Sequence, residues 1–300
     1  MDYSLYFEDK VNNLIAYLQS NNIKAMILGI SGGIDSTVCA AICHEVAKRT
    51  GIPLIGRSLP TMHNKEGEIT TAYLVGKTFC NDYKEINIQQ LYNIVRIGIN
   101  DAEIPTKSYN LIANGNVQAR LRMIYLYNMA SIHNGVVIDT DNLTEHNLGY
   151  WTLHGDVGDI CLLHDLWKTQ VFELAEWLKN WYGSYTHTYF YTDAPEVIKY
   201  KQSNLYKARS IRDSLNLKPT AGLGITDSDL EELGAESYEQ VDDILQEILS
   251  WKSFTVETNW NLKNFLEDQQ MLNIPIEIVK NVATRHFNSE FKRKHLPVKI

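Results

Sequence analysis

The run Ser31-Gly32-Gly33-Ile34-Asp35-Ser36 is the stretch of this sequence best suited to chemistry. Glycines let a backbone turn sharply and approach a ligand, and successive amides that open into a helix form a concave anion site. The hydroxyls of Ser31 and Ser36 add further donors. A carboxylate such as Asp35 fits beside phosphates only when a cation lies between them, and Mg²⁺ suits that place. The loop therefore predicts a site for nucleotide phosphates together with Mg²⁺.

This loop differs from two common nucleotide-binding motifs. It lacks the lysine that the GxxxxGK[ST] motif requires, and its glycines do not follow the GxGxxG spacing. The alternative interpretation is a strand-to-helix turn whose small residues serve packing only. The whole string, placed directly after the apolar segment 24–30, favours the phosphate site.

Segments that alternate between strand and helix patterns surround the loop. Strands are expected at residues 24–30, 52–59, 83–88 and 135–139, and helices at 36–48, 66–79, 88–99, 117–132, 166–181 and 225–249. This alternation predicts an α/β fold with a doubly wound, mostly parallel sheet that helices cover on both faces. Ligands bind such sheets at the carboxyl ends of the strands. The glycine loop and residues 139–145 should therefore face one crevice.

Composition narrows the functional classes. The chain has 300 residues, of which 44% are hydrophobic and 21% charged, as in a globular protein. A net charge of −8 argues against non-specific binding to nucleic acid or to an anionic membrane surface. No apolar run is long enough for a transmembrane helix, and the first residues lack a signal-peptide pattern. The cysteines at 39, 43, 80 and 161 show no metal-binding spacing, which predicts reduced thiols and a cytoplasmic location.

The glycine loop resembles the signature loop of the ATP pyrophosphatases, or PP-loop enzymes. That superfamily cleaves ATP to AMP and pyrophosphate while it activates an oxygen as its adenylate. Further strings resemble the NAD synthetases within it and follow in that family's order, at residues 114–123, 140–145, 155–160, 166–171, 218–223 and 289–293. The resemblance extends over residues 24–297 and implies the Rossmann-like PP-loop fold.

The resemblance implies a ligase. The carboxylate of deamido-NAD would attack the α-phosphorus of ATP, pyrophosphate would leave, and ammonia would then displace AMP to give NAD. The family is homodimeric, and the helix near residues 116–132 is the expected interface element. The resemblance also implies a single synthetase domain over residues 1–300, with its ATP pyrophosphatase core at about 22–180 and a helical portion at about 195–300. No glutaminase domain is expected, so free ammonia is the expected nitrogen source.

Motif positions assign roles to individual residues. Asp35 and Glu145 would hold Mg²⁺ and, together with Lys168, would act in catalysis. The expected ATP-binding set is Gly29, Ser31, Gly32, Gly33, Asp35, Ser36, Thr140, Lys168 and Thr220. Arg120, Asp159 and Lys292 would bind deamido-NAD. Each assignment has an ordinary structural alternative; Asp159, for instance, could stabilise a turn, and Lys292 could be a solvated residue.

The sequence departs from the family pattern on the deamido-NAD side. Asp139 stands where glycine is common, Leu153 where lysine is common, and Phe291 where histidine often precedes the lysine. The string at residues 155–159 is one residue shorter than the family's. One alternative is therefore a related PP-loop amide ligase that acts on another carboxylate or carbonyl. A nucleotide sensor without turnover is a second, and the retained Asp35, Glu145 and Lys168 argue against it.

Overall fold

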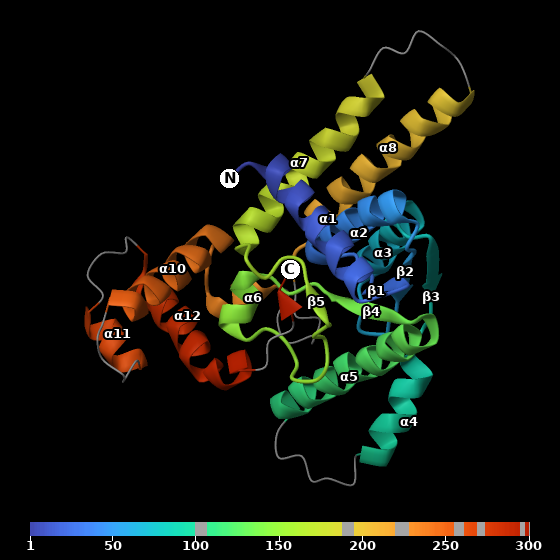
Figure 1. Cartoon of the computed structure of the whole chain (residues 1–300). Helices are drawn as coiled ribbons and strands as arrows, with labels where there is room; N and C mark the ends of the chain where they lie inside the picture. The colour runs from blue at the N-terminus through green and yellow to red at the C-terminus, as the bar shows by residue number, and fades with distance from the viewer. Residues whose placement is uncertain are drawn as a thin grey trace.

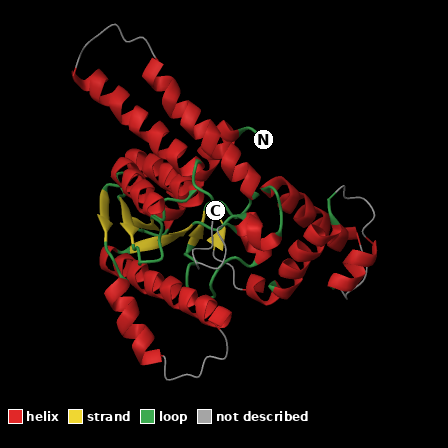
Figure 2. Cartoon of the chain, turned by 180° about the vertical axis from the view of Figure 1, so that it is seen from behind, coloured by secondary structure: helices red, strands yellow, loops and turns green. Residues whose placement is uncertain are grey.

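A six-stranded sheet lies at the centre of the computed structural model, with helices packed on both of its faces (Figures 1 and 2). The structure describes residues 1–99, 107–187, 195–219, 228–254, 261–268, 274–294 and 298–299. Its strands are β1 (Ala25–Gly29), β2 (Leu54–Ser58), β3 (Asp82–Glu85), β4 (Gly135–Asp139), β5 (Ile160–Cys161) and β6 (Val298–Lys299). The spatial order is β3-β2-β1-β4-β5-β6, and all of these neighbouring pairs are parallel. The predicted fold class is confirmed.

The strand order reverses between β1 and β4. Strand β1 pairs with β2 in the register Met26↔Leu54 and with β4 in the register Ala25↔Gly135. The chain leaves β1 toward one edge of the sheet and returns to place β4 on the other side. At such a switch point the chain leaves the two neighbouring strands toward opposite edges of the sheet, and a crevice forms between the loops that follow them, at the carboxyl ends of the strands. The glycine loop and residues 140–142 therefore lie beside each other.

Helices cover the two faces of the sheet in separate layers. Helices α1 (Tyr3–Ser20), α2 (Ile34–Thr50) and α3 (Glu66–Phe79) lie on one face, and α4 (Gln89–Ile99) and α5 (Lys107–His133) lie on the other (Figure 1). Alternate residues of β1 serve the two layers, as a pleated strand requires. Met26 and Leu28 join the main hydrophobic core with α1 and α2, whereas Ala25 and Ile27 pack toward α5.

Helices α7 (Lys168–His187) and α8 (Pro195–Leu215) lie side by side and extend away from the sheet (Figures 1 and 2). Their inner halves remain part of the main core through Leu174 and Ile211. The end of α8 also contacts the start of α2, where the hydroxyls of Thr37 and Ser214 lie 2.7 Å apart. The helical hairpin is therefore tied to the element that follows the glycine loop.

A second hydrophobic cluster lies beside the sheet and is built from helices near the end of the chain (Figure 1). Helix α6 (Leu143–Leu148) links it to the sheet. Its other elements are α9 (Asp229–Leu233), α10 (Tyr238–Phe254), α11 (Leu262–Asp268) and α12 (Ile276–Asn288), and the short 3-10 helix η1 (Glu290–Lys294) follows. None of the helices in the described ranges combines the length and apolarity that crossing a membrane requires.

Two predicted helices differ from those observed. The single helix expected at 225–249 is wrong within the described residues, because α9 ends and α10 starts separately. Gly234 ends α9 in the left-handed conformation, with φ of +67°, and Ala235 N donates to Leu230 O to close the turn. The helix expected at 117–132 is longer, because α5 begins at Lys107.

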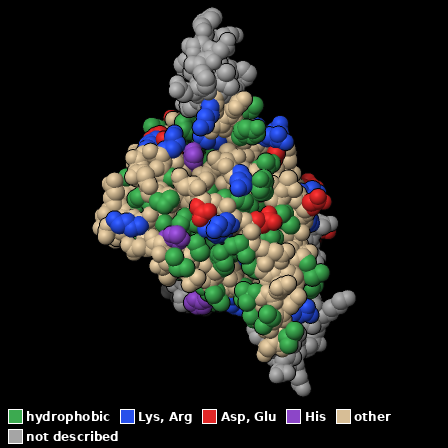
Figure 3. All heavy atoms as spheres, turned by 90° about the vertical axis from the view of Figure 1, so that its right-hand side faces the viewer, with side chains coloured by type: hydrophobic (Ala, Val, Ile, Leu, Met, Phe, Trp, Pro, Cys, Tyr) green, Lys and Arg blue, Asp and Glu red, His purple; other side chains and the backbone are tan. Residues whose placement is uncertain are grey.

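The side chains on the face drawn in Figure 3 mix basic, acidic and hydrophobic types.

Candidate active site

A cavity of about 620 Å³ opens at the carboxyl ends of β1 and β4. The glycine loop and α2 form one wall, and α5 and the segment 149–157 form another. Residues from many parts of the chain line it, among them Gly29, Ser31, Gly33, Asp35, Ser36, Arg122, Thr140, Asp141, Glu145, Trp151, Lys168, Lys218, Asp229 and Lys292. The cavity thus lies at the switch point, where the sequence predicted a ligand site.

The glycine loop is held in a tight turn by its own hydroxyls. Gly33 N donates to Ser31 Oγ at 3.2 Å, and the hydroxyls of Ser31 and Ser36 lie 3.0 Å apart. Gly32 has φ of +88°, and a Cβ there would lie 2.5 Å from the carbonyl oxygen of Glu68. Only glycine fits this position. Gly32 itself does not line the cavity, so its role is to shape the loop.

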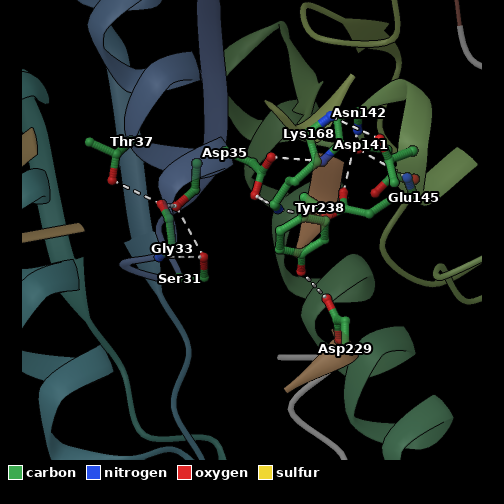
Figure 4. Close-up of polar contacts among 12 residues, drawn as sticks. Ser31, Gly33, Asp35, Thr37, Asp141, Asn142, Glu145, Lys168, Asp229 and Tyr238 are labelled. Carbon is green, nitrogen blue, oxygen red and sulfur yellow. Dashed lines mark hydrogen bonds and ion pairs between the residues drawn. The ribbon is translucent and has the colours of Figure 1, made fainter. Parts of the chain in front are cut away.

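Lys168 joins the two carboxylates expected at the metal site. Its Nζ donates to Asp35 Oδ2 at 2.6 Å and to Glu145 Oε1 at 2.8 Å (Figure 4). The lysine side chain is only 1% exposed. Burial opposes its charge, but Asp35 and Glu145 outweigh burial and hold the pKa of Lys168 well above its ordinary value. A positively charged Lys168 at the end of the glycine loop is the result.

Asn142 fixes the orientation of both carboxylates. Its Nδ2 donates to Asp35 Oδ1 at 2.8 Å, and its Oδ1 accepts from Glu145 N at 2.9 Å. The Glu145 carboxylate in turn accepts from Asn142 N at 3.3 Å, which completes a capping box at the start of α6. The cap of α6 therefore determines where Glu145 points.

The surroundings of Glu145 disfavour its ionised form. Burial and the nearby charge of Asp35 raise the pKa of Glu145 to about 7, against the opposing effect of Lys168. A further carboxylate, Asp229, lines the same cavity and accepts from Tyr238 Oη at 3.2 Å. The Tyr238 ring lies under Lys168, with its centroid 5.8 Å from Nζ (Figure 4). The site therefore carries more acidic than basic groups and favours an added cation.

The residues fit a magnesium ion. A single ammonium within 2.8 Å of both Asp35 and Glu145 means that the two carboxylates converge on one point. Mg²⁺ prefers such oxygen ligands and commonly completes its shell with water and substrate phosphates. In the described parts of the chain, no three or more His, Cys, Asp or Glu side chains are gathered as a ready metal site. A bound Mg²⁺ would thus need oxygens from water or ATP as well.

Lys292 and Trp151 lie together in the half of the cavity that the segment 149–157 forms, with Nζ 5.5 Å from the centroid of the Trp151 ring. Lys292 Nζ donates to Gly149 O at 2.7 Å and to Trp151 O, and burial lowers its pKa. Arg122 donates from Nε to Leu59 O at 3.1 Å and also lines the cavity. This half can accept an anionic ligand that carries a flat ring beside Trp151.

Two residues predicted to bind substrate do not line the cavity within this chain. Arg120 is exposed and donates to Leu153 O at 3.2 Å. It lies two positions from Arg122, about 200° around the helix, so only one of the pair can face inward. Asp159 accepts from Tyr127 Oη and from Val137 N, both at 2.9 Å, and so ties the segment before β5 to β4 and α5. Thr220 lies outside the described residues.

The structure adds residues that the sequence reasoning passed over. Asn142 had a local signal, because an asparagine three positions before a glutamate is a capping-box pattern. Tyr238 and Asp229 had none, because they approach Lys168 from a distant part of the chain. Arg122 belonged to a motif that was recognised, but only the rotation of α5 selects it over Arg120.

Comparisons with known proteins agree with this geometry. The family model described as NAD synthase matches residues 6–296. The NH(3)-dependent NAD(+) synthetase of Pyrococcus furiosus is 30% identical over 295 residues, which is 98% of this chain and 95% of the relative.

Solved structures of similar proteins include two whose names state different activities. The NMN synthetase from Francisella tularensis has a TM-score of 0.70 and 27% identity, over 99% of this chain and 98% of that one. The NH3-dependent NAD synthetase from Campylobacter jejuni has a TM-score of 0.53 and 25% identity, over 69% of this chain and 96% of that one.

Proposed function

The chain belongs to the NAD synthase family, and on that premise we propose that it amidates deamido-NAD with ammonia and ATP. The products are NAD, AMP and pyrophosphate, and the enzyme is a ligase that forms a C–N bond. The observation that carries this proposal is the convergence of Asp35, Glu145 and Lys168 at the end of the glycine loop.

The ATP half of the site suits adenylation. The loop amides and the first amides of α2 would donate to the phosphates, and Ser31 and Ser36 add hydroxyl donors. Attack by a carboxylate on the α-phosphorus leaves negative charge on pyrophosphate, and Lys168 is the fixed cation beside that charge. Asp35 and Glu145 would hold Mg²⁺, which supplies further positive charge to the phosphates. Thr140 lines the same half, and Thr220 remains part of the proposed ATP site.

The acid substrate would occupy the half that contains Lys292 and Trp151, and Arg122 lines the cavity from α5. Lys292 supplies a cation for a nucleotide phosphate, and Trp151 supplies a flat surface for a ring. Arg120 and Asp159 keep their proposed roles in substrate binding only if a second subunit or a rearrangement brings them to the ligand.

A second acid is a candidate substrate beside deamido-NAD. The similarity to an NMN synthetase, at a TM-score of 0.70, favours nicotinate mononucleotide, the acid from which NMN would be formed. The departures at Leu153 and Phe291 stand at positions that the family resemblance assigns to binding of the dinucleotide. Adenylation and ammonia attack would be unchanged, because only the part of the substrate remote from the reacting carboxylate differs.

The experiment is product analysis with ATP, Mg²⁺ and ammonium, given either deamido-NAD or nicotinate mononucleotide. We expect AMP, pyrophosphate and NAD in equal amounts from deamido-NAD. A higher kcat/KM for the mononucleotide would move the assignment to the second acid. Binding of ATP without amidation of either acid would refute the ligase assignment.

Five further properties belong to the same proposal. Mg²⁺ is the cofactor, because the paired carboxylates are hard oxygen ligands. The protein is a homodimer through α5. It is cytoplasmic, since Cys39, Cys43, Cys80 and Cys161 are free thiols. The chain works as one synthetase domain and takes free ammonia; turnover with glutamine alone would contradict that nitrogen source.

A further inference from the structure

Asp242 is a buried carboxylate that no part of the proposed chemistry uses. It lies on α10 and is 1% exposed. Its Oδ1 accepts from Thr144 Oγ1 at 2.5 Å, and its Oδ2 accepts from Thr169 N at 3.0 Å and from Thr169 Oγ1 at 2.8 Å. A carboxylate removed from water needs such donors. All three come from the starts of two other helices.

Those two helix starts carry the residues of the phosphate site. Thr144 precedes Glu145 in the first turn of α6, and Thr169 follows Lys168 in the first turn of α7. Lys168 N donates to Thr144 Oγ1 at 2.8 Å, so Thr144 is bonded both to Lys168 and to Asp242. A second bond, from Leu143 N to Leu166 O at 2.8 Å, joins the segments that lead into the helices. Asp242 therefore fastens α6 and α7 at the point where Glu145 and Lys168 meet.

The charge of Asp242 suits its position. The first amides of a helix lack partners within the helix and carry partial positive charge. The Asp242 carboxylate accepts from one of these amides in α7 and so acts as a cap supplied by a distant element. Burial raises its pKa, while the bonds from Thr144 and Thr169 oppose that rise. Tyr238, one turn earlier on α10, lies beneath the Lys168 side chain.

We propose that Asp242 is a positioning residue for the adenylation step, acting through Thr144 and Thr169 on Glu145 and Lys168. This inference rests on the proposed function. Lys168 stabilises the leaving pyrophosphate only if its ammonium is held where charge develops, and a displacement of about 1 Å can cost on the order of 100-fold in rate. The helices near the end of the chain thereby contribute to the phosphate site without touching ATP.

The test compares Asp242→Ala with Asp242→Asn. The alanine removes both acceptor oxygens and with them all three hydrogen bonds. The asparagine retains the shape: its oxygen can accept from Thr169 N, and its amide can donate to Thr144 Oγ1. Asp243→Ala is the matched control, because Asp243 is the next residue of α10 and is exposed. Thr144→Val removes the hydrogen bond from Lys168 N to Thr144 Oγ1 but leaves the bonds from Thr169 to Asp242. If Asp242→Ala fails to fold, the rate of Thr144→Val tests the positioning role instead.

Two measurements are made on each variant. The first is pyrophosphate exchange into ATP in the presence of the acid substrate, which reports adenylation alone. We expect kcat of exchange to fall about 100-fold in D242A with KM for ATP little changed, and D242N to recover most of the rate. T144V should lose rate as well, and D243A should match the unmodified chain. The second is hydrogen exchange of the Thr169 amide, which donates to Asp242 and should lose protection in D242A but not in D242N, T144V or D243A; the Lys168 amide, which donates to Thr144, should lose protection in T144V.

The outcomes separate this inference from the proposed function. No exchange by the unmodified chain with either acid would defeat the proposed function. Unchanged amide protection in D242A would defeat the positioning role by itself. A lower melting temperature in D242A with the rate of D243A would also defeat it, because the bonds would then serve folding only. Equal losses in D242N and D242A, with T144V unaffected, would mean that charge and not position matters, and would overturn the proposal.

Discussion

Nζ of Lys168 lies 2.6 Å from Oδ2 of Asp35, although 133 positions separate the two residues along the chain. Lys168 starts α7, and Asp35 lies in the first turn of α2. The same ammonium also contacts Glu145. The three charges therefore form one unit, in which the lysine is held in place by the groups proposed to bind Mg²⁺. Binding of Mg²⁺ with ATP would bring a second cation to the carboxylates and free Lys168 to contact phosphate.

Replacing Lys168 with methionine should abolish most of the adenylation rate. The variant keeps a side chain of similar length but loses the cation beside the leaving pyrophosphate, a loss expected to lower kcat by about 100-fold or more. AMP release under saturating substrates measures it. Lys179→Met is the control, because Lys179 lies on the same helix and pairs with Glu176. Equal rates of AMP release in the two variants would show that Lys168 does not stabilise the leaving pyrophosphate.

Gly32→Ala should damage both folding and ATP binding, whereas Gly51→Ala should cost only stability. Both glycines have positive φ, +88° and +76°, and a non-glycine residue there costs about 1–2 kcal/mol. Nothing lies within 4 Å of a Cβ added at Gly51, but a Cβ at Gly32 meets the Glu68 carbonyl at 2.5 Å. The glycine loop must therefore shift in G32A, whereas the backbone around residue 51 can stay in place in G51A.

Urea unfolding and calorimetric titration with ATP test this contrast. We expect G51A to bind ATP with the affinity of the unmodified protein, since Gly51 lies at the far end of α2 from the loop. G32A should be the less stable variant and should bind ATP more weakly. Normal ATP affinity in G32A would mean that the loop shape is not what holds the phosphates.

Ile124→Asp should dissociate the proposed dimer. Ile124 on α5 is 58% exposed in the single chain, and its neighbour Met123 lines the cavity. A carboxylate buried in an apolar interface is strongly unfavourable. Light scattering should give half the mass of the unmodified protein, and KM for the acid substrate should rise. Ile276→Asp on α12, where the isoleucine is 51% exposed, is the control and should change neither. A monomeric unmodified protein would contradict the dimer directly.

Local patterns in the sequence predicted the parallel sheet and the crevice, and the family resemblance pointed to Asp35, Glu145 and Lys168. The glycine loop had a local signal, because its residue types and its place after an apolar strand define the turn. Asp35, Glu145 and Lys168 lay in recognisable strings, and the switch point of the sheet brings them together. The glycine loop and the crevice needed only short-range pattern and the parallel arrangement of strands, whereas Glu145 and Lys168 were assigned through the resemblance of their strings to a known family.

The remaining contacts depend on packing that no local pattern specifies. Asp242 and Tyr238 reach the site because the second hydrophobic cluster packs α10 against α6 and α7. Whether Arg120 or Arg122 faces the cavity depends on the rotation of α5, which is set by the residues that pack it on the sheet. Asp159 belonged to a recognised string, yet its carboxylate accepts hydrogen bonds from Tyr127 Oη and Val137 N and does not line the cavity. Motif membership alone does not reveal the direction of a side chain.

His286 should make the protein less stable in mild acid. It is buried in α12, and burial, followed by the charges of Arg293 and Lys252, lowers its pKa to about 2. An exposed histidine in the unfolded chain takes a proton near pH 6.5. Between pH 6.5 and 2 the unfolded chain therefore binds one more proton than the folded protein. The contribution of His286 to the free energy of unfolding is fully present above pH 6.5 and is lost progressively as the pH falls below 6.5. At pH 5 this loss is about 2 kcal/mol.

His286→Gln should remove that part of the pH dependence. The glutamine oxygen can still accept from Lys252 Nζ, which lies 3.0 Å from His286 Nε2, but the side chain cannot take a proton. Urea unfolding at pH 7 and pH 5 measures the difference in free energy between the two conditions. That difference should shrink by about 2 kcal/mol in H286Q. His133→Gln, at an exposed position, should leave it unchanged. The same loss of stability in H286Q and in the unmodified protein would show that His286 takes its proton in the folded state as readily as in the unfolded chain.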